Sequence, residues 1–158
     1  QWRALPLLDG QLQNDPERKL RLRWARRLGL PLMPALLLGA ADPVATAQRL
    51  QIPGKQQQWL QQCVALHNWL ADTPPCLEAS PSIWSTALEQ QGWQPEAVAL
   101  AVTLRPKPWK PLLRWWGRWR KIQAPQTARD LLAAGWQPGP GMGEELRRQR
   151  NAAQERSR

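Results

Sequence analysis

The sequence predicts an all-α protein, an irregular bundle of about seven or eight short helices without a sheet. Three observations lead to this prediction. Apolar residues recur at helical spacing in several segments, and no segment alternates apolar and polar residues as a half-buried strand does. Asp-Pro pairs and glycines, which start and end helices, recur along the chain. With 42% hydrophobic residues, a chain of 158 residues is long enough to bury a core.

The first predicted helix begins at Asp15-Pro16-Glu17 and ends at Gly29-Leu-Pro31. Asp favours the N-cap, Pro the first helical position and an acid the first turn, while Gly followed by Pro is a stop signal. Leu20, Trp24 and Leu28 recur every fourth residue, so they predict a narrow apolar stripe in a coat of Arg and Lys.

The apolar segment 30–41 is short and interrupted by prolines, so we expect a buried helix and not a membrane span. Asp42-Pro43 starts another helix that ends near Gln51. Helical spacing and turn signals predict three more helices, at 55–71, 82–91 and 95–104.

The segment Arg105-Pro-Lys-Pro-Trp-Lys-Pro111 is too rich in proline for regular structure, and Pro111 is expected to open the next helix. In that helix Leu112, Trp115, Trp119 and Ile122 form the predicted core stripe. We therefore divide the chain into a helical body-like region (1–104), a Pro/Lys tether (105–111) and a basic C-terminal helical hairpin region (112–158).

Twenty-two Lys and Arg against twelve Asp and Glu give a net charge of +10, which favours a polyanionic partner. Nucleic acid is the first candidate, an anionic membrane the second, and an Arg-rich background without a polyanionic partner is the alternative. All eleven aromatic residues are Trp, which fills cores but also stacks on bases. The RNA-binding candidates are Lys110, Arg114, Trp116, Arg118, Arg120, Lys121, Arg147 and Arg148.

Cys63 and Cys76 are the only thiols, and a reduced, cytoplasmic chain is expected. Cys63 and His67 stand four residues apart on one helical face, but with Cys76 they make three ligands and no fourth. No metal site is predicted.

A helical hairpin is predicted after residue 124. Thr127 and Asp130 indicate a capping box, and Gly135 indicates the end of that helix. The loop glycines Gly139, Gly141 and Gly143 have two readings: they expose amides to a phosphate, or they let two helices pack closely.

The pattern Asp130-Leu-Leu-x-x-Gly135-x-x-Pro-Gly-Pro140-x-x-Gly143-x-x-Leu146 resembles the C-terminal motif of class II tRNA nucleotidyltransferases, the CCA-adding enzymes and their bacterial poly(A) polymerase relatives. The stretch from Leu112 to Thr127 stands where that family carries a basic, tryptophan-containing helix. Segments from Ala47 onward are similar in order to the family's helical body, and the specific motif lies in the C-terminal part.

The resemblance implies a helical region that grips the acceptor and T arms of tRNA by backbone charge and shape. The family's catalysis lies in a separate head domain, whose metal-binding aspartates imply Mg²⁺ and ATP or CTP. This sequence contains no Asp-x-Asp, so the resemblance implies no catalytic residue and no cofactor here. Because the chain opens on Gln1, we expect a fragment of such an enzyme, inactive alone.

A second resemblance concerns Asn14-Asp15-Pro16-Glu17-Arg18, which is similar to the Glu-Asp-x-x-Arg of the family's nucleotide-selecting neck except at Asn14. It implies that Asp15 and Arg18 pair with the edge of ATP or CTP; the alternative is an Asp-Pro helix start.

Two other functions stay open from the sequence. A helix-hairpin-helix DNA-binding protein also presents loop amides to phosphates, although Pro140 removes one donor. A non-catalytic scaffold would bind a protein partner through an exposed apolar patch around Trp109 and Trp116.

Overall fold

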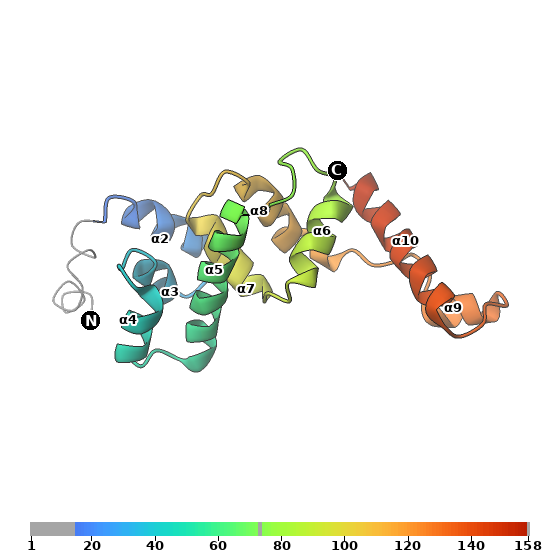
Figure 1. The fold of residues 1–158 in the computed structure, drawn as a ribbon, viewed down its shortest axis with the longest axis horizontal. Coiled ribbons are helices and arrows are strands. Elements are labelled where there is room, and N and C mark those ends of the chain that lie inside the picture. Colours follow the sequence, from blue (N-terminus) through green and yellow to red (C-terminus); the bar gives the residue numbers. More distant parts are fainter. Residues whose placement is uncertain (1–14, 73, 158) are drawn as a thin grey trace. The chain divides into compact units, whose positions relative to one another are not determined.

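The structure is a computed structural model that describes residues 15–72 and 74–157. Every regular element in these ranges is a helix, which confirms the all-α prediction (Figure 1). The elements are α2 (Arg18–Arg27), α3 (Leu32–Leu37), α4 (Pro43–Arg49), α5 (Gly54–Asp72), α6 (Pro81–Gln90), α7 (Pro95–Thr103), α8 (Trp109–Gly117), the 3-10 helix η2 (Trp119–Lys121), α9 (Ala128–Ala133) and α10 (Pro140–Arg156). None of these helices has the length and apolar character needed to span a membrane.

The chain forms two compact units. The first comprises the chain up to Pro74 together with Trp93–Leu113, and the second comprises Pro75–Gly92 together with the chain from Arg114 onward. The units alternate along the sequence because α6 packs against α10 and η2, whereas α7 packs against α2, α3 and α5. They therefore do not follow the linear order of the three predicted regions.

Helix α7 is the centre of the first unit. Its residues from Ala97 to Thr103 are all buried, as expected for a helix that is apolar on all sides. Helix α5 runs beside it (Figure 1). A further cluster of buried side chains joins α3, α4 and α5 and includes Leu36, Leu37, Ala47, Ile52 and Leu60. The predicted buried helix in 30–41 is thus confirmed as α3.

Two helix ends in this unit follow the predicted signals. The side chain of Asp42 accepts a hydrogen bond from the Ala45 amide at 3.1 Å and caps α4. Gly29 has a φ of +71° and follows the C-cap of α2, where the Leu30 amide donates to the Ala25 carbonyl at 2.9 Å.

The predicted start of α2 at Asp15 is wrong, since the helix begins at Arg18. Asp15 accepts a hydrogen bond from the Glu17 amide at 3.2 Å and forms a bidentate ion pair with Arg21. The Nε of Arg21 donates to the Ala35 carbonyl at 2.9 Å. The two charged side chains are only 4% and 6% exposed, so this is a buried pair that ties α2 to α3.

The predicted apolar stripe of α2 is also wrong. Arg21 and Ala25 are the buried residues of this helix, whereas Leu20 is 36% exposed. The physical reason is that Asp15 neutralises Arg21, which lets the polar side chain face the interior. The ion pair also requires a glycine at position 39, because a Cβ there would lie 2.6 Å from a terminal nitrogen of Arg21 and would clash with it.

Helix α8 differs from the prediction at both ends. It begins at Trp109, inside the predicted irregular tether, because Pro111 falls in the first turn where a missing amide hydrogen costs nothing. It ends at Gly117 and not at Ile122, and Arg118 leaves the helical region with φ −134° and ψ −59°. Leu112, Trp115 and Trp119 are nevertheless buried, as predicted.

Substitution of Asp15 tests the buried ion pair. Asp15→Ala leaves Arg21 buried without a counter-charge, and we expect the free energy of unfolding to fall by about 3–5 kcal/mol. Urea unfolding measures this loss, with Arg23→Ala as the control because Arg23 is exposed on the same helix. A loss in Asp15→Ala no larger than in the control would contradict the role of the pair.

The same pair makes stability depend on pH. Burial acts to raise the pKa of Asp15, but the hydrogen bonds and charge of Arg21 outweigh it and hold the pKa below its ordinary 3.8. A carboxyl group with a depressed folded-state pKa stabilises the fold above its unfolded pKa and loses that contribution as pH falls through the folded value. We expect Asp15→Asn to remove this part of the acid-induced loss of stability, measured by urea unfolding across the acid range.

Thiol labelling tests the placement of the cysteines. Cys63 is buried, and burial raises the pKa of its thiol to about 12, whereas Cys76 is exposed. Iodoacetamide at neutral pH should modify Cys76 in the native protein and both thiols in denaturant, as read by intact mass. Equal labelling rates in the native protein would contradict this packing.

Candidate nucleic-acid interface

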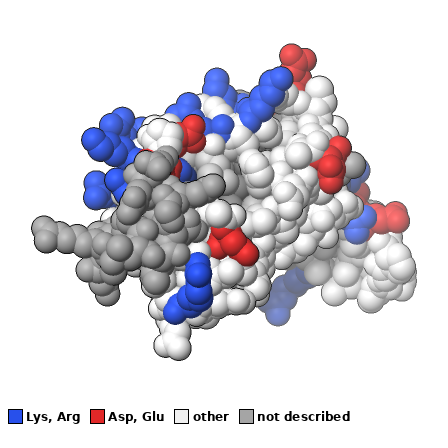
Figure 2. Space-filling model, turned by 60° about the vertical axis from the view of Figure 1, so that its left-hand side comes forward, with Lys and Arg blue, Asp and Glu red and all other residues white. Residues whose placement is uncertain are grey.

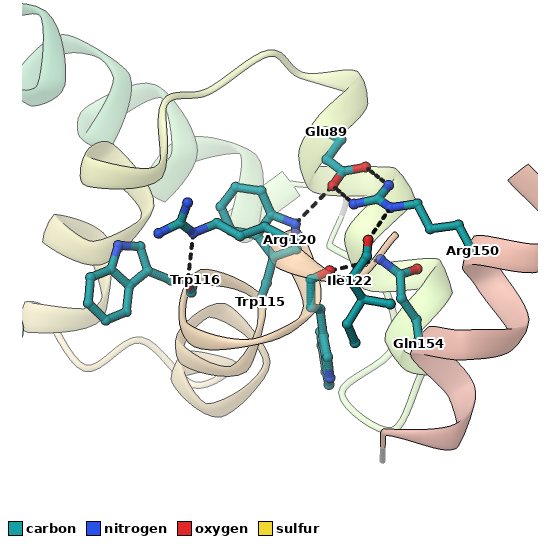
Figure 3. Close-up of polar contacts among 8 residues, drawn as sticks. Glu89, Trp115, Trp116, Arg120, Ile122, Arg150 and Gln154 are labelled. Atoms are coloured by element: carbon teal, nitrogen blue, oxygen red, sulfur yellow. Dashed lines mark hydrogen bonds and ion pairs between the residues drawn. The ribbon is translucent and has the colours of Figure 1, made fainter. Parts of the chain in front are cut away.

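The second unit is organised around the carboxylate of Glu89 on α6. It accepts two hydrogen bonds from the guanidinium of Arg150 on α10, at 2.7 and 2.6 Å, and one from the indole of Trp115 at 3.4 Å. Figure 3 shows these groups converging on Glu89. One carboxylate thereby holds α6, α8 and α10 together.

Helix α10 is also fixed to the backbone of the segment that contains η2. The Nε of Arg150 donates to the carbonyl of Ile122 at 2.9 Å (Figure 3). One turn farther on, the amide of the buried Gln154 donates to the carbonyl of Trp119 at 3.1 Å. These two side-chain bonds to backbone carbonyls hold α10 in one defined register against η2 and the residue that follows it.

The predicted hairpin is present as α9 and α10. The Thr127 hydroxyl accepts from the Asp130 amide at 3.2 Å, and the Asp130 carboxylate accepts from the Thr127 amide at 2.9 Å, which confirms the capping box. Gly135 ends α9 with a φ of +99°, and the Trp136 amide donates to the Leu131 carbonyl at 3.0 Å.

The loop glycines do not serve close packing. A Cβ at Gly139, Gly141 or Gly143 would meet no heavy atom within 4 Å. Gly139 is required for another reason, its φ of +153°. For phosphate binding, Pro140 has no amide hydrogen, and the Met142 and Gly143 amides already donate to the Gly139 carbonyl. A hollow of about 550 Å³ at this loop is lined by 134–142, without a charged side chain.

A second hollow, unlike the first, is lined by charged side chains. This groove of about 570 Å³ is lined by residues of η2, of the segment that follows it, and of α9 and α10, among them Arg120, Thr127, Arg147 and Arg150. The structure thus brings together Arg120 and Arg147, two sequence-predicted RNA-binding residues that lie 27 positions apart. We call this hollow the arginine groove.

Arg120 is held in place while its outer nitrogens stay available. Its Nε donates to the Trp116 carbonyl at 2.5 Å, and its guanidinium lies 5.9 Å from the centre of the Trp116 ring (Figure 3). Its terminal nitrogens bond to no residue within the described ranges. Trp116, predicted as a stacking platform, is half-buried and covered by Arg120, so it orients the arginine.

Other predicted cations of this unit lie outside the arginine groove. Arg114 and Lys121 are exposed, and neither side chain bonds to any residue that the structure describes. Arg118 is exposed, and one of its terminal nitrogens donates to the Ser157 carbonyl at 3.1 Å.

Arg148 is already neutralised. Its guanidinium forms a bidentate pair with Glu145, at 2.9 and 2.6 Å, although it is 69% exposed. Hydrogen bonds from Arg148 and Gln149 hold the pKa of Glu145 at about 2. Arg147, by contrast, is exposed, and its side chain bonds to no residue among 15–72 and 74–157.

The remaining sequence predictions fall in the first unit. Both carboxylate oxygens of Asp15 bond to Arg21, so Asp15 has no oxygen left to accept a hydrogen bond from a nucleotide, as the resemblance implied together with Arg18. Asn14 lies outside the described residues. Lys110 is exposed beside the ring of Trp109. Cys63 is buried while His67 is exposed, and no cluster of potential metal ligands occurs in the described part of the chain.

Sequence reasoning missed Glu89 and Arg150. Arg150 continues the i, i+3 spacing from Arg147, but only the fold reveals that Glu89, 61 positions away, receives it. The signal that could have pointed to Glu89 is that it is an acidic residue of α6 in a strongly basic chain, where an arginine partner is expected.

No family model, curated protein or solved structure matches the chain.

Substituting the central acid tests the arrangement of α10. We expect Glu89→Ala to lower the free energy of unfolding by about 1–3 kcal/mol, because it leaves the Arg150 and Trp115 donors unpaired. Chemical denaturation measures the loss, and Glu144→Ala on the exposed side of α10 is the control. A loss in Glu89→Ala within about 0.5 kcal/mol, the range of ordinary surface substitutions, would show that Glu89 does not hold these helices.

Proposed function

We propose that this chain binds RNA through phosphate contacts in the arginine groove. The observation that carries the proposal is that Arg120 and Arg147 line one groove and both keep unused guanidinium donors. Guanidinium forks match phosphate oxygens in geometry and charge. The net charge of +10 adds attraction at longer range.

We further propose tRNA as the RNA, and the role as that of the helical RNA-gripping part of a tRNA nucleotidyltransferase. The support is the motif from Asp130 to Leu146, which forms the capped hairpin beside the arginine groove. Helical RNA is recognised mainly through phosphates and shape, which suits arginines on rigid helices. In such an enzyme the nucleotide and Mg²⁺ would belong to a head domain, and this chain would bind and orient the RNA.

The alternatives receive less support. In the scaffold reading, Trp109 and Trp116 would form an open apolar patch, but cations lie over both rings. In the helix-hairpin-helix reading, the loop amides would hold the phosphate, but two of them donate within the first turn of α10.

Binding of a fluorescent tRNA minihelix, measured by anisotropy across a range of salt concentrations, tests the proposal. Arg147→Gln should weaken binding and reduce the slope of log affinity against log salt by about 0.7–0.9, the value for one lost phosphate contact. The matched control is Arg156→Gln, which removes an exposed arginine from the opposite side of α10.

Equal slopes for Arg147→Gln, Arg156→Gln and the unsubstituted chain would contradict the arginine groove as the RNA site. The tRNA assignment has a separate test. At moderate salt, the chain should bind the minihelix more tightly than a DNA duplex of equal length, and equal affinity would remove that part of the proposal.

A further inference from the structure

Helix α2 in the first unit carries a concentration of charge that its own fold does not neutralise. Six of its ten residues are Lys or Arg and none is acidic. Arg21 is neutralised by Asp15, but Lys19, Arg23 and Arg26 are exposed, and their side chains bond to no residue in the described ranges. Figure 2 turns the left-hand side of Figure 1, where α2 lies, toward the viewer, and several Lys and Arg side chains (blue) lie in its upper left part.

This arrangement works against the stability of the isolated helix. Lys19 and Arg23, and then Arg23 and Arg27, stand four residues apart, and like charges at this spacing cost about 0.2–0.5 kcal/mol per pair. Arg26 and Arg27 gain some energy from the helix dipole at the C-terminal end, but Lys19 and Arg23 do not. A bound polyanion would remove the repulsion.

The basic side chains of α2 also shape a hollow. It has a volume of about 460 Å³ and is lined by Lys19, Leu22, Arg23, Arg26 and Arg27. From Lys19 to Arg27 the helix rises about 12 Å, so these cations are spread along the helix and can contact more than one phosphate.

Two aromatic rings, Trp24 on α2 and Trp109 on α8, lie against cations. The guanidinium of Arg105 lies 5.3 Å from the ring centre of Trp24 and 4.5 Å from that of Trp109. Arg27 lies 5.5 Å from the Trp24 ring, and Lys110 lies 5.8 Å from the Trp109 ring. A guanidinium that lies over a ring keeps the N–H donors at its edge free for a phosphate. Because the ring already restricts the side chain, it loses less conformational entropy on binding than a mobile arginine does.

The backbone of Arg105 is unusual for an arginine. Its φ of +50° lies in the left-handed region that favours glycine, directly after the C-cap of α7. A non-glycine residue there costs on the order of 1 kcal/mol. The guanidinium, which lies against both the Trp24 and the Trp109 rings, is the feature that a glycine would lack.

We infer that Lys19, Arg23, Arg26, Arg27 and Arg105 form a second phosphate-binding surface, on the first unit, which contacts an RNA backbone. The inference rests on the proposed function for the identity of the polyanion. Because the five side chains named are cations, and cations lie over the Trp24 and Trp109 rings, this surface contacts the RNA backbone and does not read base sequence.

The test compares charge-matched double variants of the full chain in the minihelix assay. Arg23→Gln with Arg27→Gln should reduce the salt slope by roughly 1.4–1.8, the value for two phosphate contacts. The control is Arg49→Gln with Lys55→Gln, which removes the same charge from exposed positions on α4 and α5 and should leave the slope close to that of the unsubstituted chain. Circular dichroism verifies that both double variants are folded.

Equal effects of the two double variants, or no effect of either, would overturn the second surface. If Arg147→Gln weakens binding while Arg23→Gln with Arg27→Gln does not, the second surface fails and the arginine groove stands. If the unsubstituted chain does not bind the minihelix at all, both proposals fail.

A membrane is the other source of phosphates. Vesicles of phosphatidylcholine with phosphatidylserine should bind the chain more weakly than RNA does, at equal salt. Vesicle binding that depends on Arg23 and Arg27, together with RNA binding that does not, would assign the surface to a membrane and overturn the inference.

Discussion

Glu89 accepts hydrogen bonds from Arg150 and from Trp115, so one carboxylate joins α6, α8 and α10. The chain has only twelve acidic residues against twenty-two Lys and Arg. The geometry of the arginine groove depends on this contact. Arg150 also binds the Ile122 carbonyl, which fixes α10 against the segment that carries Arg120. Arg147 lies one turn before Arg150 on the same helix, so the register of α10 decides whether Arg147 lines the groove.

The distribution of charge separates structural cations from available ones. Arg21, Arg148 and Arg150 each meet a carboxylate, and each of these pairs organises local structure. Arg105 and Arg120 lie over indole rings, which orient them without cancelling their charge. Arg23 and Arg147 meet neither an acid nor a ring among the residues that the structure describes. An RNA backbone would therefore meet cations of two kinds, some free and some oriented in advance.

Local signals in the sequence were sufficient where neighbouring residues decide the structure. The capping box of Thr127 and Asp130 and the stop at Gly135 depend only on residues a few positions apart. The same holds for the Asp-Pro start at Asp42.

Prediction failed where distant contacts outweigh local preference. An arginine in the core of the first unit contradicts helical periodicity, and it is explained only by a carboxylate and a carbonyl that the fold brings to it. The end of α8 at Gly117 was missed because the apolar spacing of Trp115 and Trp119 continues across a residue of low helix propensity. For the candidate site, the sequence supplied Arg120 and Arg147 as separate basic residues, and their common groove required the tertiary structure.

The most direct measurement is an NMR titration of the full chain with a tRNA minihelix, following the Nε–H signals of the arginine side chains. The signals of Arg120 and Arg147 should shift together as RNA is added, while that of Arg156 stays in place. Shifts at Arg156, or unchanged Arg120 and Arg147 signals under conditions where the RNA is bound, would contradict the arginine groove as an RNA-binding site.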